Sequence, residues 1–104
     1  MVKINERLMQ SGSMQMNENQ FRDELAKDGF PAPVIVEREA NGSLGIHTHP
    51  FEAKALILSG QIDITVDGIK VSYQVGDVFH LLKDQEHSES YGPSGVRYLA
   101  GRKD

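Results

Sequence analysis

The chain has 104 residues and a mass of 11.6 kDa, which is the size of one small domain. The absence of cysteine excludes disulfides, cysteine-ligated zinc, iron–sulfur clusters and thiol catalysis. A net charge of -4 opposes nucleic-acid binding, and no apolar run approaches the roughly 20 residues that span a bilayer, so we expect a cytoplasmic protein without nucleic-acid or membrane partners.

A single helix is predicted near the N-terminus, from residue 18 to residue 28, after a polar, Met-rich arm at residues 1–17. Asn17 is suited to cap this helix, with Gln20 as its reciprocal partner in a capping box. Gly29 suits the left-handed position that ends a helix. One apolar face, expected to pack against a sheet, is formed by Phe21 and Leu25.

From residue 34 onward the apolar residues alternate with polar ones, which predicts strands. The expected strands are residues 34–40, 44–49, 54–58, 61–66, 69–75, 78–82, 86–91 and 96–100. Asp67-Gly68 is a typical two-residue hairpin turn, and Ser59-Gly60 is interpreted as another hairpin turn. Many short strands at this spacing favour an all-β sandwich or barrel, here a single domain over residues 18–104 with its strands at about 34–100.

The four histidines all lie between His47 and His87. In a strand, residues two apart point to the same face, so the imidazoles of His47 and His49 can converge on one point. His87 lies on a later strand that sheet closure can bring near them. Neutral imidazoles bind Fe, Mn, Ni, Zn or Cu, with coordination positions left open for water or substrate. The alternative is a pair of polar residues on a solvated strand.

The spacing around these histidines resembles the two sequence motifs of the cupin superfamily. The first motif, G-x5-H-x-H-x3/4-E-x6-G, is similar to the segment from Gly42 to Gly60, with one residue fewer before His47. The second motif, G-x5-P-x-G-x2-H-x3-N, is similar to residues 76–91, where the Pro, Gly and Asn are replaced by Leu82, Asp84 and Tyr91. The resemblance covers about residues 34–99 and implies a small antiparallel barrel of the jelly-roll type.

The acidic residue of the first motif is where this chain departs from the family. Counting back from Gly60, the position of the cupin glutamate falls on Ala53, or on Lys54 with the alternative spacing. Glu52 is the candidate carboxylate ligand, although it comes one residue early unless the turn at residues 50–51 resets its strand parity. The remaining set resembles the three-histidine sites of acetylacetone dioxygenase and cysteine dioxygenase within the superfamily: His47, His49 and His87.

Glu89 and Tyr91 are the candidate catalytic residues. Glu89 shares a face with His87 if the strand is continuous. Its candidate roles are a fourth metal ligand, a general base or an acceptor for an imidazole N–H. The alternative is a salt bridge at the barrel mouth. Tyr91 stands at the position of the motif asparagine. His80 is expected to be a hydrogen-bonded barrel residue rather than a ligand. The expected barrel lining is Ile57, Phe79, Tyr91 and Tyr98.

Three functions are consistent with these residues, because one fold hosts many activities. The first is a metal-dependent enzyme acting on a small organic molecule, with dioxygenase chemistry as its leading form and Fe, Mn, Ni or Zn as the divalent ion. The second is a non-catalytic module that binds or senses a small ligand. The third is a metal-free structural barrel. A homodimer is expected, since free strand edges favour association.

Overall fold

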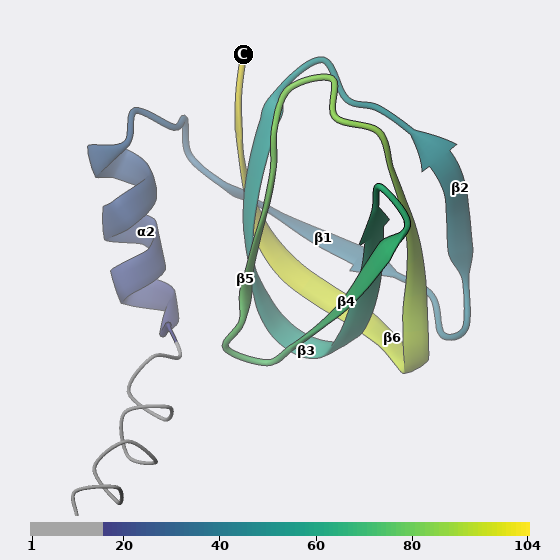
Figure 1. Cartoon of the computed structure of the whole chain (residues 1–104). Coiled ribbons are helices and arrows are strands. Elements are labelled where there is room, and N and C mark those ends of the chain that lie inside the picture. The colour runs from purple at the N-terminus through teal and green to yellow at the C-terminus, as the bar shows by residue number, and fades with distance from the viewer. Residues whose placement is uncertain (1–15) are drawn as a thin grey trace, which may run out of the picture.

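The computed structural model describes residues 16–104, so nearly all of the predicted arm at residues 1–17 lies outside the described residues. Within that range one helix and six strands follow each other along the chain (Figure 1). They are α2 (Glu18–Lys27), β1 (Val34–Arg38), β2 (Ser43–His47), β3 (Glu52–Val66), β4 (Ile69–Gln74), β5 (Val78–Leu81) and β6 (His87–Lys103). The described part contains no helix long and apolar enough to cross a membrane.

The barrel is organised around the two long strands β3 and β6. β6 pairs with β1, β2 and β3, while β3 pairs with β4, β5 and β6, and every pairing is antiparallel. Because each long strand pairs with different neighbours along its length, the sheet bends round into a barrel, as Figure 1 shows. The predicted all-β barrel with a short helix is confirmed.

The prediction of a hairpin turn at Ser59-Gly60 was wrong. Residues 54–66 form one continuous strand, with register shifts on either side of Gly60. Gly60 has φ +78°, and a Cβ added to it would lie 2.1 Å from the carbonyl oxygen of Gly95. A positive φ serves a bulge as well as a turn, and here it lets β3 and β6 cross closely. The segments 86–91 and 96–100 are likewise parts of one strand.

The Asp67-Gly68 hairpin was predicted correctly. Both residues have positive φ, 52° and 79°, as a type I′ turn requires, and they join β3 to β4. The helix was also predicted correctly to within one residue. Asn17 and Gln20 form both halves of the capping box, and Gly29 has φ +81°.

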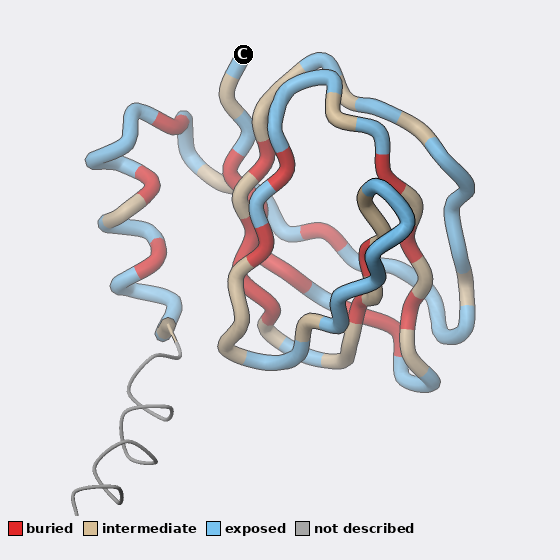
Figure 2. Tube along the Cα trace, in the orientation of Figure 1, coloured by how far each residue is buried: buried red, intermediate tan, exposed pale blue. Residues whose placement is uncertain are grey.

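Two apolar clusters hold the structure together, and Figure 2 shows the buried positions along the strands and on one side of the helix. One cluster fills the barrel. The other lies between α2 and the outer face of the sheet and contains Phe21, Leu25, Phe30, Leu56 and Leu99. Gly101 permits this packing, because a Cβ there would lie 2.8 Å from a methyl group of Leu25.

Candidate metal centre

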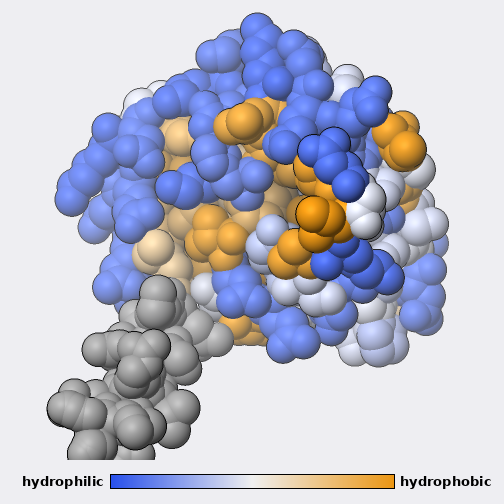
Figure 3. Space-filling view, viewed as in Figure 1, coloured by the Kyte–Doolittle hydropathy of each residue, from blue (hydrophilic) through white to orange (hydrophobic). Residues whose placement is uncertain are grey.

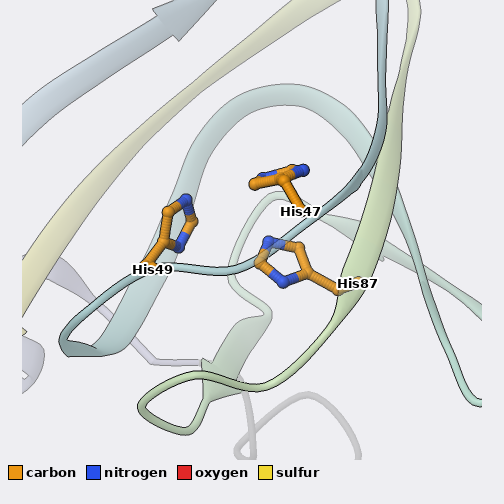
Figure 4. Close-up of side chains that lie close together, drawn as sticks. All are labelled: His47, His49 and His87. Atoms are coloured by element: carbon orange, nitrogen blue, oxygen red, sulfur yellow. The ribbon is translucent and has the colours of Figure 1, made fainter.

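Three histidines converge at one end of the barrel. His47 is the last residue of β2 and pairs in register with His87, the first residue of β6. His49 lies two residues beyond β2, where its carbonyl oxygen accepts a hydrogen bond from the Asp84 N–H at 2.8 Å. Figure 4 shows the three rings gathered from the two chain segments, and one ligand atom from each lies within 4.8 Å of the others. Together they could hold a metal ion.

The backbone fixes the ring orientation of two of these histidines. The Nδ1 atoms of His47 and His87 lie 2.7 Å and 3.0 Å from the carbonyl oxygens of Gly45 and Gln85. A carbonyl oxygen only accepts, so each Nδ1 carries a proton, and in the neutral ring Nε2 is the nitrogen with a lone pair for a metal. Both Nε2 atoms are buried and have no hydrogen-bond partner within the described residues. This is the arrangement in which histidine binds metals.

Glu89 supplies a carboxylate to the same place. Its Oε2 atom lies 3.3 Å from the Nε2 of His87 and 3.6 Å from the Nε2 of His47, and the residue is only 8% exposed. Its Oε1 atom accepts a hydrogen bond of 2.8 Å from the Tyr91 hydroxyl. Two imidazole Nε2 atoms and a carboxylate oxygen therefore face one another in a buried space, an arrangement that a cation or proton between them stabilises.

Tyr91 is placed to hold Glu89 rather than to exchange a proton at neutral pH. Burial, and then the hydrogen bond to Glu89, raise the pKa of Tyr91 above its ordinary value, so the hydroxyl stays protonated and donates. Burial, followed by the charges of His87 and His47, lowers the pKa of His49 and keeps that imidazole neutral at neutral pH. The neutral form is the one that binds a metal.

Known protein families and curated proteins give no sequence match, whereas solved structures do. The cupin domain of Cnp3 from Schizosaccharomyces pombe superposes with a TM-score of 0.61 at 21% identity, over 70% of this chain and 56% of that one. A cupin superfamily protein from Desulfitobacterium hafniense gives 0.59 at 20% identity, over 66% and 62%. The chain has the cupin fold. The DMSP lyase DddQ from Ruegeria pomeroyi superposes with a TM-score of 0.61 at 20% identity, over 67% of this chain and 36% of that one. This chain thus spans between 36% and 62% of the length of these three proteins.

In this cupin fold Glu52 is not brought into the histidine cluster. It begins β3, and its Oε2 atom hydrogen-bonds to the Nε2 of His80 at 2.6 Å. His80 is therefore a hydrogen-bonded residue of β5, its side chain 45% exposed, as the sequence indicated. Ala53, at the position of the cupin glutamate, lines the pocket beside the histidines. The carboxylate near the imidazoles thus comes from β6, through Glu89, rather than from β3.

A pocket opens beside the histidines into the barrel. It is bordered by His49 and Glu89. Of the predicted lining residues, Phe79 and Tyr98 border it, whereas Ile57 and Tyr91 lie in the barrel core. Sequence reasoning missed Arg38 and Arg102, which also border the pocket. The signal was strand parity, because Arg102 follows the inward-facing Tyr98 and Ala100 at steps of two.

Proposed function

We propose that this chain binds a divalent metal ion and acts on a small organic molecule in the adjoining pocket, as an oxygen-dependent enzyme of the dioxygenase type. The observation that carries the proposal is the pair of buried Nε2 atoms of His47 and His87, which have their Nδ1 protons held by the backbone and no partner of their own among the described residues. Buried polar atoms in proteins are normally paired. A metal ion would give both nitrogens their partner.

The donor set suits a first-row divalent ion. His47, His49 and His87 would hold the ion, and Oε2 of Glu89 is the carboxylate oxygen next to them. Imidazole nitrogens with a carboxylate are typical ligands of iron, manganese, nickel and zinc. When bound, such an ion supplies Lewis-acid chemistry and, in the case of iron, redox chemistry towards O2.

The residues around the histidines have separate tasks in this proposal. Glu89 carries negative charge and can accept a proton at Oε2, because Oε1 is occupied by the Tyr91 hydroxyl. Tyr91 is a positioning residue that keeps the carboxylate turned towards the imidazoles. Phe79 and Leu81, on the pocket wall formed by β5, provide an apolar surface that displaces water from the bound molecule.

A metal-free barrel is the second candidate, and one distance favours it. If His87 is protonated at both nitrogens, its Nε2 and Oε2 of Glu89, at 3.3 Å, form a buried ion pair. A small-molecule binding or sensing barrel would use the same pocket with the metal only as an anchor. Metal content separates the metal-free barrel from the other two functions.

The decisive measurement is the metal content of the purified chain by elemental mass spectrometry after loading with Fe(II), Mn(II), Ni(II) and Zn(II). We expect about one ion per wild-type chain and less than about a tenth of that in the His49→Ala and His87→Ala variants. His80→Ala is the matched control, because His80 pairs with Glu52 outside the cluster, and it should load like wild type. Equal loading of wild type and His87→Ala would contradict the proposal.

Catalysis is tested next with the loaded chain. Oxygen uptake against a panel of diketones, phenols, thiols and small acids separates an oxygen-dependent enzyme from a binding module. The expected result is uptake that depends on one substrate class and disappears in His87→Ala. A metal-loaded chain that consumes no oxygen with any class would assign it to the binding or sensing alternative.

The predicted homodimer remains a proposal. β4 is the end of the sheet path, and Ile69 and Val71 on it are 68% and 43% exposed. Figure 3 shows hydrophobic side chains at the surface in the middle of one face, among hydrophilic ones. An edge strand with exposed apolar residues favours pairing with a second copy. Light scattering should give a dimer mass for wild type and a monomer mass for Ile69→Lys.

A further inference from the structure

We propose that the pocket beside the histidines takes a small organic carboxylate and that Arg102 and Arg38 recognise its negative charge. The inference rests on the proposed function only in treating the bound carboxylate as a substrate. Binding of the carboxylate does not need the metal, because both arginines belong to the chain itself and border the pocket.

Arg102 is held at the pocket by a stack of rings. It lies on the inward-facing side of β6, two residues after Ala100, and its guanidinium carbon is 5.3 Å from the centroid of the Phe51 ring. Phe51 in turn lies parallel to His49, with 4.9 Å between the ring centroids. A guanidinium over an aromatic ring keeps its N–H groups, which lie in its own plane, able to donate hydrogen bonds. The contact with Phe51 therefore places Arg102 near His49 without using its donors.

Arg38 brings a second positive charge to the pocket, from β1. It is the last residue of β1, and one Nη1–H donates to the carbonyl oxygen of Glu37 at 3.2 Å. Its positive charge lowers the pKa values of Tyr91 and Tyr98, against the larger effect of burial, and at Tyr91 a hydrogen bond from Arg38 acts in the same direction. A guanidinium has five N–H donors, so most of them remain for a ligand.

Neither pocket arginine has a carboxylate partner among residues 16–104. Arg22 and Arg97 pair with Glu18 and Glu37, at 3.0 Å and 3.2 Å, whereas no ion pair within 4.0 Å forms at Arg38 or Arg102. Glu89, the acidic residue that borders the pocket, is directed towards the imidazoles and Tyr91. The pocket thus has two guanidinium groups that make no ion pair with a carboxylate of residues 16–104, so both are available to an anionic ligand.

The shape of the pocket selects a short carboxylate with an apolar remainder. Small side chains open the space, namely Ala53, Ala55 and Ala100, and one of them replaces the glutamate expected from the motif. With alanine at this position, Glu89 is the one acidic residue among the described residues that border the pocket. Phe79 and Leu81 add apolar surface from β5, in register with Ala55 and Ala53 of β3. A carboxylate on the guanidinium groups therefore leaves an apolar chain against β5.

The test is a two-dimensional NMR titration of the full metal-free chain with straight-chain carboxylates from acetate to hexanoate and with the matching amides. We expect saturable shifts in residues 49–53 and 98–102 with a carboxylate, and binding at least about 10-fold weaker for the amide of equal length, because charge-assisted hydrogen bonds to a guanidinium are lost. Arg102→Gln should weaken carboxylate binding by about 10- to 100-fold and Arg38→Gln by a smaller factor.

Arg97→Gln is the matched control, since Arg97 lies on the same strand but pairs with Glu37 at the surface, and it should bind carboxylates like wild type. Unchanged spectra away from the pocket show that each variant is folded. Equal binding of carboxylate and amide, equal binding by Arg102→Gln, or no saturable binding of any carboxylate would each overturn the inference. Repeating the titration in the presence of zinc separates the two proposals. If the chain binds carboxylates but does not bind zinc, the proposed metal function is refuted and the carboxylate site stands.

Discussion

The helix-covered face of the sheet and the histidine end of the barrel differ in whether their buried groups have packing or hydrogen-bond partners. On the helix-covered face, Phe21 and Leu25 pack against Leu56 and Leu99, and the helix ends are capped by Asn17 and Gly29. At the histidine end, two buried imidazole nitrogens and a carboxylate face one another with no hydrogen bond between them. The first region contributes stability through apolar burial. The second gives up stability for a polar site, which is where function is expected.

The largest expected effect concerns the helix-covered face. Leu25→Ala removes a side chain that is 1% exposed and should lower the free energy of unfolding by about 2–5 kcal/mol, through lost burial and the cavity left behind. Urea denaturation measures this change. Leu82→Ala, at a position that is 56% exposed, is the control and should change stability by less than about 0.5 kcal/mol. If the folded Leu25→Ala chain also failed to bind zinc where wild type binds it, the two regions would not be separable.

A somewhat smaller effect is expected at the histidine end. Glu89→Gln keeps the shape of the side chain but removes its negative charge beside the imidazoles, so metal affinity should fall by about 10- to 100-fold. Calorimetric titration with Zn(II) measures this. Glu86→Gln, at an exposed position three residues earlier, should bind zinc like wild type. Unchanged affinity in Glu89→Gln would mean that the carboxylate serves Tyr91 alone.

The smallest effect concerns a carboxylate whose partners are in place. Asp63 accepts hydrogen bonds from Ser72 at 2.6 Å and from Gln61 at 3.0 Å, and these two bonds hold its pKa below the ordinary value. A lowered folded pKa gives stability above the unfolded value, about 3.9, that is lost as the pH falls through the folded pKa. Ser72→Ala should therefore destabilise by less than about 1 kcal/mol at neutral pH and by less still in acid.

Urea denaturation of wild type and Ser72→Ala at neutral and acidic pH checks this sign. A variant whose deficit grew in acid would contradict it. Asp63 is a partly exposed carboxylate with hydroxyl and amide donors, which makes it a local stabilising feature. Glu89 is buried next to the Nε2 atoms of two imidazoles, at 3.3 Å and 3.6 Å.

Prediction from the sequence succeeded where neighbouring residues decide the conformation. The capping box, the left-handed Gly29 and the Asp67-Gly68 hairpin each depend on a few adjacent residues. It failed at Ser59-Gly60, because a positive φ at a glycine is compatible with a turn or with a bulge, and only the approach of Gly95 on a distant strand decides between them. The extent of β3 and β6 followed from that same crossing.

The sequence by itself determined the all-β fold, the helix and the three histidines, because periodicity and the spacing of His47 and His49 are local properties. Only the tertiary structure decided which carboxylate reaches them. Glu52 hydrogen-bonds to His80, whereas Glu89 of β6 lies next to the imidazoles. Arg38 and Arg102, from different strands, border the same pocket. The physical reason is that the closure of a barrel sets side-chain proximity through strand register, and register depends on the whole sheet.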